Sequence, residues 1–516
     1  MNLNIGIMFN KLFRLSFLFI FFVELISLCV FLLPELMPAV FFIILALVLF
    51  ISLYSLEYGL LILLAELFIG SKGYLFFLEI GGINISIRIA FWLIIMAVWL
   101  ADLFIELYKR KQKPRISNLK NSFFPYFMVL FLFIAWGLVN GFINNNSFNN
   151  IFFDFNGWLY FALIFPIYSV IFKNKDCLKK IFTVFAASII WLSLKTYFLL
   201  FIFSHNMIGM IEEVYHWIRV SGVGEITNLQ GGFYRIFFQS HIYVLAGFFI
   251  FLIFLINQKT KFSSKKLFIN NLVIFFTFLS LFLSVVLLSF SRSNWVGLAF
   301  GVIIFILFLL YKKEWKKALI SVFILISALA VSLCFIIVTV KFPYPDPTGG
   351  FSATELLSNR ASQLTGEAAL SSRWSLLPEL WEKIKKAPIL GSGFGATITY
   401  ISSDPRILEA DPSGKFTTFA FEWGWLDIWI KLGILGIITY IALIFKIFII
   451  AISKKQKNNE SIIIALAISL AVLTIVSFFS PYMNHPLGIG FLMLAAAAID
   501  KNRAVHNKAI IDTERI

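Results

Sequence analysis

The sequence has little charge, little cysteine and little histidine, and each shortage excludes a class of protein. Only 14% of its 516 residues are charged, whereas 60% are hydrophobic. A soluble globular domain carries about 25% charged residues, so this composition cannot cover a water-exposed surface. The three cysteines, Cys29, Cys177 and Cys334, have no paired spacing. We therefore expect no disulfide framework and no metal–thiolate site.

The familiar motifs for metals and nucleotides are also missing. The five histidines have no zinc-type spacing, and the chain has neither a phosphate-binding P-loop nor a Ser-His-Asp order. The glycine run at 391–395 is too compact for a dinucleotide fingerprint. No internal repeat indicates the paired halves of a transporter. We expect neither a metal nor another cofactor.

Long apolar runs are what the sequence has in abundance. Many reach about 18 residues, the length that crosses a bilayer, and in lipid such a run must be helical to satisfy its own backbone. The first run resembles a signal peptide, but it lacks a small-residue cleavage site and leads straight into another span. We predict an all-α polytopic membrane protein with fourteen spans: 15–33, 39–56, 59–78, 88–107, 122–140, 157–172, 181–203, 239–257, 268–290, 294–311, 318–340, 424–452, 461–479 and 486–500.

The basic residues predict one orientation for these spans. If both termini are cytoplasmic, the inner segments hold 27 of the 43 Lys and Arg residues. The short outer loops 34–38, 141–156 and 480–485 hold none. This is the positive-inside pattern, and it accounts for most of the net charge of +16. Nucleic acid is not an expected partner, because the basic residues are divided among many short loops.

Two outer segments are much longer than the others, at 204–238 and 341–423. The second divides the chain into a bundle of about eleven spans at 1–340, an outer loop at 341–423, and about three spans with a cytoplasmic tail at 424–516. An amphipathic helix is predicted over 369–386, with Trp374, Leu377, Leu380, Trp381 and Ile384 at helical spacing. The loop is a candidate functional module on the membrane surface, or otherwise a partly disordered connector.

Arginines at the outer membrane edge are the first candidates for a site, since charge near hydrocarbon is costly. Arg292 lies in a very short outer turn, Arg235 precedes a span, and Arg373 begins the loop helix. Their planar guanidinium groups suit phosphate oxygens. The alternative is that each one extends to lipid headgroups, and for Arg88, at the outer start of the fourth span, we favour that alternative.

Acid–base candidates are fewer. Glu422 enters the membrane beside Trp423, and a partly desolvated carboxyl group there would have a raised pKa and serve as a base. The alternative is an interfacial acid beside an aromatic belt. His241 begins the eighth span, where it either bonds a substrate or simply lies at the interface.

Three motifs resemble the O-antigen ligase and Wzy-type polysaccharide polymerase superfamily. The run 291–295 (SRSNW) resembles that family's "SRgaW" signature at a span boundary. The stretch 373–395 (RWSLLPELWEKIKKAPILGSGFG) resembles its loop pattern of an Arg, an amphipathic helix and Pro-x-x-Gly-x-Gly-x-Gly. The stretch 423–436, ending in WIKLGILG, resembles the start of the span after the loop. The similarity covers about 220–440.

One departure from the family pattern concerns the reacting group. In ligase members a His-Asn pair precedes the "elGilG" pattern by about eleven residues, and here that position holds Glu422-Trp423. A His-dependent mechanism and the ligase label are therefore in doubt, and we place the chain in the more variable polymerase branch.

The resemblance implies a metal-independent glycosyltransferase of the membrane-embedded C type in the cytoplasmic membrane. Its donor would be a polyprenyl-diphosphate-linked oligosaccharide at the outer leaflet, and its acceptor a glycan on a second lipid-linked repeat unit. Partners would include membrane lipid and, in the cell, a chain-length regulator and a flippase. Arg235 and Arg292 are assigned to the diphosphate, Arg373 to diphosphate or sugar, and Glu422 to the acceptor hydroxyl. Trp423 and His241 complete the candidate substrate contacts.

Three other functions remain possible for this sequence. A ligase or protein O-oligosaccharyltransferase of the same superfamily would move the finished glycan to another acceptor. A transporter or flippase for the lipid-linked oligosaccharide would have charges inside its spans, and Lys195, Lys431 and Lys446 are the residues to check. The last is a structural membrane protein without a site.

Overall fold

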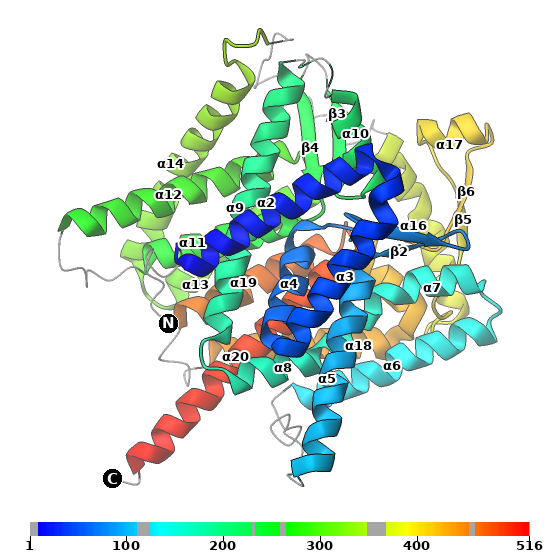
Figure 1. Cartoon of the computed structure of the whole chain (residues 1–516). Helices are drawn as coiled ribbons and strands as arrows, with labels where there is room; N and C mark the ends of the chain where they lie inside the picture. Colours follow the sequence, from blue (N-terminus) through cyan, green and yellow to red (C-terminus); the bar gives the residue numbers. More distant parts are fainter. Residues whose placement is uncertain are drawn as a thin grey trace.

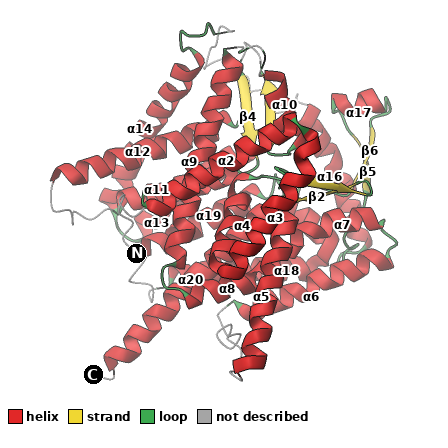
Figure 2. Cartoon of the chain, viewed as in Figure 1, coloured by secondary structure: helices red, strands yellow, loops and turns green. Residues whose placement is uncertain are grey.

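The computed structural model describes residues 9–110, 123–205, 207, 209, 211–229, 233–257, 265–347, 368–453 and 460–514. Over these ranges the chain is mainly helical, and its strands are confined to three short hairpins (Figure 2). Part of the predicted outer loop, 348–367, and the predicted inner cluster Lys454-Lys455 lie outside the described residues.

Ten helices among the described residues are long and apolar enough to cross a membrane. They are α2 (Lys11–Leu32), α3 (Met37–Tyr54), α5 (Ile87–Arg110), α6 (Phe124–Ile143), α9 (Cys177–Ser204), α12 (Lys265–Leu288), α13 (Arg292–Tyr311), α14 (Trp315–Val340), α18 (Gly424–Ile452), and one broken helix made of α7 (Phe148–Asn156), the 3-10 helix η3 (Gly157–Leu163) and α8 (Ile164–Lys173). The chain is thus a multi-pass membrane protein.

Three shorter helices and a longer one complete the bundle: α4 (Leu56–Ile69), α11 (His241–Ile256), α19 (Glu460–Val476) and α20 (Pro486–Glu514). Each of the fourteen predicted spans overlaps a helix, but the count of fourteen and the C-type architecture stay predictions. The predicted span 59–78 is too long, because α4 ends after 14 residues at Ile69. At 1.5 Å per residue α4 covers about 21 Å, less than the hydrocarbon core.

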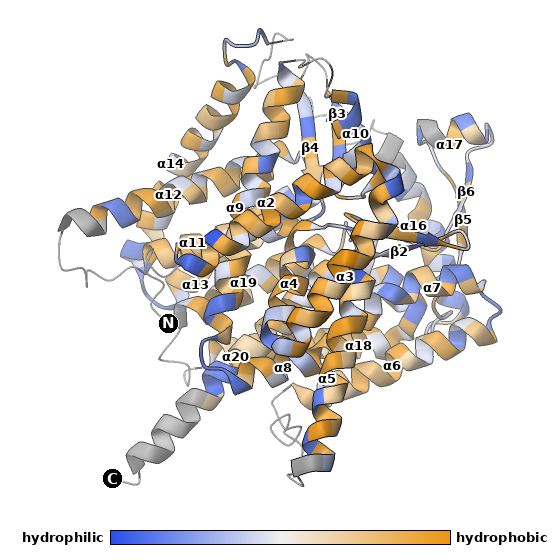
Figure 3. Cartoon of the chain, in the orientation of Figure 1, coloured by the Kyte–Doolittle hydropathy of each residue, from blue (hydrophilic) through white to orange (hydrophobic). Residues whose placement is uncertain are grey.

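Burial separates the lipid-facing helices from the centre. Figure 3 shows that apolar residues dominate the bundle, and on α3 and α14 large side chains such as Phe50 and Phe323 are more than two-thirds exposed. In contrast, α11 is buried on all sides and packs against α12 and α19. A helix that is apolar all round belongs at the centre of a bundle or in lipid, and α11 is central.

Three antiparallel hairpins, absent from the all-α prediction, lie away from the two marked chain ends (Figure 1). They pair β1 (Phe77–Ile80) with β2 (Ile83–Ser86), β3 (Gly224–Asn228) with β4 (Tyr234–Phe238), and β5 (Ile398–Ile401) with β6 (Lys415–Thr418). A small helix, α10 (Ile211–Val220), accompanies β3. We call this part of the molecule the hairpin end.

A module at residues 368–423 covers part of the hairpin end. It consists of α16 (Ala368–Lys386), the β5–β6 hairpin and α17 (Pro405–Ala410). The predicted loop helix is confirmed, and so is the burial of Leu380 and Ile384, but the two predicted tryptophans are exposed. Leu376, Leu380 and Ile384 form a small core with Phe421, whereas Trp374 is 58% exposed.

Segments predicted to lie on the same side of the membrane meet at the hairpin end. Ser71, after α4, and Ser240, before α11, share a hydroxyl contact of 3.1 Å. The Ser480 hydroxyl, after α19, donates to the Ser293 hydroxyl at 3.0 Å. The predicted loops therefore share one end of the bundle, and the placement of this end outside the cytoplasm remains a prediction.

Candidate functional site

Arg292 begins α13 at a tight turn from α12. Its predecessor Ser291 caps the helix, with the side-chain oxygen accepting from the Asn294 backbone N–H at 3.5 Å. Phe290, just before the cap, holds a φ of 44°, in the left-handed region that bulky side chains avoid. The turn thus reverses the chain between two spans within a few residues and leaves the Arg292 side chain partly buried at the membrane edge.

Arg235 lies on β4 and is tied to the same turn. Its Nε donates to the backbone oxygen of Ser289 at 2.8 Å, and its guanidinium lies over the Phe237 ring at 4.9 Å. Burial lowers the pKa of Arg235 from its ordinary value, and the like charge of Arg373 lowers it further, against the attraction of Glu225. A cation held in this way has free energy to gain from an added anion.

Arg373 comes to this edge from α16. Its Nε donates to a carboxylate oxygen of Glu422 in an ion pair, and its backbone oxygen accepts from the Trp423 indole at 3.0 Å. The Trp374 and Trp423 rings meet edge to face at 5.6 Å. The predicted neighbours Arg373, Glu422 and Trp423 are therefore brought together by direct contacts.

The three arginines converge on one edge of the hairpin end. Arg373 lies close enough to both Arg235 and Arg292 for the charges to repel. Arg235 is itself bonded to the turn that leads into Arg292. A β-strand, a helix start and a loop helix, separated by up to 138 positions in the sequence, thus place three guanidinium groups in a common neighbourhood.

Glu422 differs from its predicted environment. We expected a carboxyl group desolvated beside aromatic rings, but the side chain is 51% exposed and paired with Arg373. Its backbone lies just before α18, where the module rejoins the bundle.

His241 lies at the start of α11 and is fully buried. Its Nδ1 accepts from the Phe238 backbone N–H at 3.3 Å, and its Nε2 lies 3.0 Å from the Thr196 hydroxyl. Because Nδ1 accepts, the ring proton resides on Nε2 and is donated to Thr196. Both ring nitrogens are thus engaged inside the protein, and His241 serves the packing of α9 against α11.

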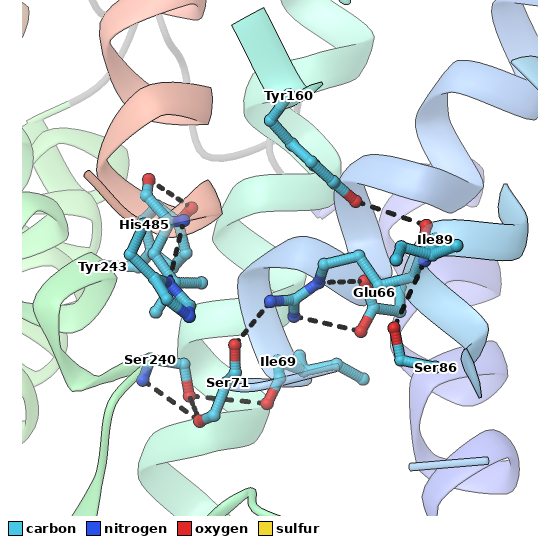
Figure 4. Close-up of polar contacts among 11 residues, drawn as sticks. Glu66, Ile69, Ser71, Ser86, Ile89, Tyr160, Ser240, Tyr243 and His485 are labelled. Atoms are coloured by element: carbon cyan, nitrogen blue, oxygen red, sulfur yellow. Dashed lines mark hydrogen bonds and ion pairs between the residues drawn. The ribbon is translucent and has the colours of Figure 1, made fainter. Parts of the chain in front are cut away.

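Arg88 does not extend to lipid headgroups as expected. It is buried and forms a two-pronged ion pair with Glu66, with Nε–Oε2 and Nη2–Oε1 distances of 2.8 and 3.0 Å. Its Nη1 donates to the Ser71 backbone oxygen at 2.5 Å. Figure 4 shows Glu66, Ser71 and Ser240 in this network, which joins α4 and α5 to the segment before α11. Arg88 has its partners here and is not one of the arginines that converge with Arg373.

The glycine run at 391–395 proves to be a docking turn. Asn140 on α6 donates to the backbone oxygen of Gly391 at 2.9 Å, and the Ser392 N–H donates to the backbone oxygen of Ile430 on α18 at 2.6 Å. On α18 itself, Gly433 leaves the helical conformation with a φ of 72° and admits the turn against its backbone. Two motifs that were recognised separately in the sequence are therefore two sides of one contact.

Residues 275–441 match a family model described as O-antigen ligase. This match supports the similarity of the chain to the O-antigen ligase and Wzy-type superfamily. No curated protein shows a significant match to the chain. The matched range contains two of the three arginines, Arg292 and Arg373, together with Glu422 and the docking turn. Arg235 lies outside the match and joins the site through its bond to the α12–α13 turn.

The sequence drew attention to Lys431 as a lysine within a span, but the carboxylates that surround it were not predicted. Lys431 of α18 is buried between Asp154 of α7 and Asp427 of α18, and Asp427 also accepts from Asn484. The four-residue spacing of Asp427 and Lys431 is a helical ion-pair signal that was available in the sequence. Nothing local connects either residue with Asp154, almost 280 positions earlier.

Proposed function

We propose that the chain is a glycosyltransferase that polymerises polyprenyl-diphosphate-linked oligosaccharide repeat units at the outer leaflet of the cytoplasmic membrane. The product would be an O-antigen, capsular or other envelope polysaccharide. The O-antigen ligase domain and the multi-pass helical fold support an enzyme that acts on lipid-linked glycans. The polymerase assignment rests on Glu422, which stands where ligase members carry histidine.

The convergence of Arg235, Arg292 and Arg373 is the observation that carries the proposal. The charge of Arg373 repels both Arg235 and Arg292, and Arg373 is itself paired with Glu422. An anion with several oxygens would offset this repulsion, and guanidinium groups bind such oxygens in pairs. A diphosphate at the membrane edge has the required charge and geometry.

The chemistry follows from the leaving group. As the bond between the anomeric carbon and the diphosphate oxygen breaks, negative charge grows on the diphosphate. Arg235 and Arg292 stabilise that charge, which is the largest single effect in many active sites. The acceptor hydroxyl forms the new bond to the anomeric carbon, and its proton passes to the Glu422 carboxylate, which turns from Arg373 to receive it. The exposed Trp374 ring offers a face for sugar stacking.

A ligase of the same superfamily is the nearest alternative, and its donor would occupy the same arginines. A transporter is less well supported. Two of the three intramembrane lysines are neutralised by carboxylates: Lys195 lies 2.7 Å from Glu24, and Lys431 contacts Asp154 and Asp427. Paired charges packed between helices give no sign of a path for a charged substrate.

The test is complementation of a deletion strain by variants of Arg292. We expect Arg292→Ala to abolish polymerisation, a loss of at least about 100-fold for one transition-state charge contact, with normal membrane insertion. Arg292→Lys should also be poor, because a point charge does not reproduce the planar fork. The matched control is Arg219→Lys on α10, whose side chain is exposed and only loosely paired with Glu225.

Glycan analysis of the same strains separates the alternatives. Accumulation of single-repeat products supports the polymerase, whereas full-length chains left on the polyprenyl carrier support a ligase. Wild-type chain length in the Arg292→Ala strain would remove the proposal.

A further inference from the structure

We propose that Asp154, Lys431 and Asp427 form a positioning cluster that holds the 368–423 module, and with it the Arg373–Glu422 pair, in register with Arg235 and Arg292. The inference deepens the proposed function, on which it rests for the identity of what is positioned. The cluster itself touches no proposed reacting group, so its three members are positioning residues.

The cluster joins three segments that are distant in the sequence. The Lys431 ammonium contacts both carboxylates, with distances to Asp427 of 2.6 and 2.8 Å. Asp154 uses its other oxygen to accept from the Gly395 backbone N–H at 2.9 Å. Asp427 accepts from the Asn484 side chain in the loop between α19 and α20. One buried cation therefore fixes α7, α18 and the docking turn together.

The docking turn, whose Gly395 N–H donates to Asp154, is the attachment point of the module. Asn146 donates to the backbone oxygen of Phe394 at 2.8 Å, and the Phe394 N–H donates to the backbone oxygen of Gly137 at 3.0 Å. Each of these bonds satisfies a backbone group of the turn, but none carries a full charge. The bond from Gly395 to Asp154 involves a charged carboxylate, and charged hydrogen bonds are roughly twice as strong as neutral ones.

Burial explains why the cluster specifies one arrangement. All three charged side chains are at most 6% exposed. Separating a buried ion from its partner costs several kcal/mol, because no water replaces the lost contact. The module can leave its docked position only by separating Asp154 from the Gly395 N–H and leaving a buried charge without that contact. The cluster therefore acts mainly by making other docking geometries unfavourable, and less by stabilising the native one.

A direct connection leads from the cluster to Glu422. The Lys431 ammonium lies 5.7 Å from the centre of the Phe421 ring, and Phe421 is the residue before Glu422. The Phe421 ring packs into the small core with Leu376 and Leu380 of α16, the helix that carries Arg373. Lys431 thus supports the core between the two partners of the Arg373–Glu422 pair.

Hydrogen–deuterium exchange of the full-length protein in lipid nanodiscs tests the cluster without any activity assay. We expect Lys431→Met to speed exchange of the amides at 391–396 and 372–386 at least tenfold. The matched control is Lys446→Met, 15 positions further along α18 and about 22 Å away. Unchanged exchange at 391–396 in Lys431→Met would overturn the inference.

Two further variants cover the case in which Lys431→Met fails to fold. Asp154→Leu removes the acceptor for the Gly395 N–H but leaves Lys431 paired one to one with Asp427, so the turn alone should exchange faster. The neutral triple variant Asp154→Asn, Asp427→Asn, Lys431→Met keeps an acceptor at 154 but removes the buried charges, so the turn should still exchange faster than in the wild type. Wild-type exchange in Asp154→Leu would contradict the proposed attachment.

Polymerisation kinetics separate positioning from simple stabilisation. If the cluster acts through the Arg373–Glu422 pair, Asp154→Leu should lower kcat and raise the donor KM, because Arg373 is one of the proposed diphosphate contacts. Its effect on kcat should be smaller when Glu422→Gln is already present. If the losses in kcat of Asp154→Leu and Glu422→Gln multiply in the double variant, the two residues act independently and the positioning role is contradicted. Full activity in Arg292→Ala would instead remove the proposed function and leave the exchange result standing.

Discussion

A guanidinium group at the edge of a membrane can bind the phosphate of a lipid headgroup or the phosphate of a bound ligand. Arg88 shows a third solution, since it is buried with Glu66 and donates to a backbone oxygen. Arg235 and Arg292 differ from it because each lies near a like charge, that of Arg373. At the scale of single residues, the kind of neighbour separates a structural arginine from a candidate ligand-binding one.

Glu422→Gln tests the acid–base part of the account. The amide keeps the shape of the side chain but cannot take the acceptor proton, so we expect kcat to fall by about 100-fold with little change in donor KM. Steady-state polymerisation with a purified lipid-linked repeat unit measures both constants. Glu382→Gln, an exposed and ion-paired residue on the same module, is the control. Full activity in Glu422→Gln would return Glu422 to an interfacial ion-pair role.

The sequence predicted these residues unevenly, for physical reasons. Arg292 and Arg373 could be identified because each stands beside a recognisable turn or helix start. His241 and Arg88 look equally suitable in the sequence, but their buried partners, Thr196 and Glu66, become apparent only when helices pack. Long-range pairing of this kind leaves no local pattern, and for the same reason the contact of Asp154 with Lys431 was missed.

At the scale of elements, glycines decide how the module attaches. Gly393 holds a φ of 78°, and a side chain there would run into the backbone of Gly141 on α6. Gly82 in the β1–β2 turn has the same φ of 78° but nothing within 4 Å of the place where a side chain would begin. The two positions therefore differ in crowding and not in backbone conformation.

This pair gives a matched experiment. Gly393→Ala should both strain the backbone, by about 1–2 kcal/mol, and push the turn away from α6. Gly82→Ala carries the strain alone. We expect Gly393→Ala to lose polymerisation and to lower the thermal unfolding midpoint in detergent by more than Gly82→Ala does. Equal effects of the two substitutions would contradict the docking role of the turn.

Helix positions were the most predictable elements, because a continuous apolar run has few alternatives in lipid. The hairpins were missed because strands of four or five residues give too short an alternation to stand out. The α16 helix was predicted, but only part of its buried face was. Its core partner, Phe421, comes from the far end of the loop, and the exposed tryptophans suggested the wrong face.

At the scale of the whole molecule, the account requires the hairpin end to lie outside the cytoplasm. The structure gathers the predicted outer segments at one end, and the distribution of lysine and arginine predicts its side. Cysteine labelling tests this placement. In a background with Cys29, Cys177 and Cys334 replaced by serine, Ser413→Cys should react with a membrane-impermeant maleimide in intact spheroplasts. Both Ser413, on the module, and Lys313, in the α13–α14 turn, are exposed.

The α13–α14 turn provides the control. Lys313→Cys should react only after the membrane is permeabilised, because it lies at the other end of α13 from Arg292. Labelling of Lys313→Cys but not of Ser413→Cys in intact spheroplasts would invert the topology. It would also remove the reason for a lipid-linked donor, since nucleotide sugars are available on the cytoplasmic side.

We propose that Arg235, Arg292 and Arg373 together bind the diphosphate of a lipid-linked donor. The most direct measurement is the affinity of the purified protein in nanodiscs for a short polyprenyl diphosphate and for its monophosphate. We predict that the wild type binds the diphosphate at least tenfold more tightly, and that Arg292→Lys and Arg235→Lys each lose that preference while Arg219→Lys keeps it. Equal binding of the two lipids by the wild type, or a preference unchanged in both variants, would contradict the account.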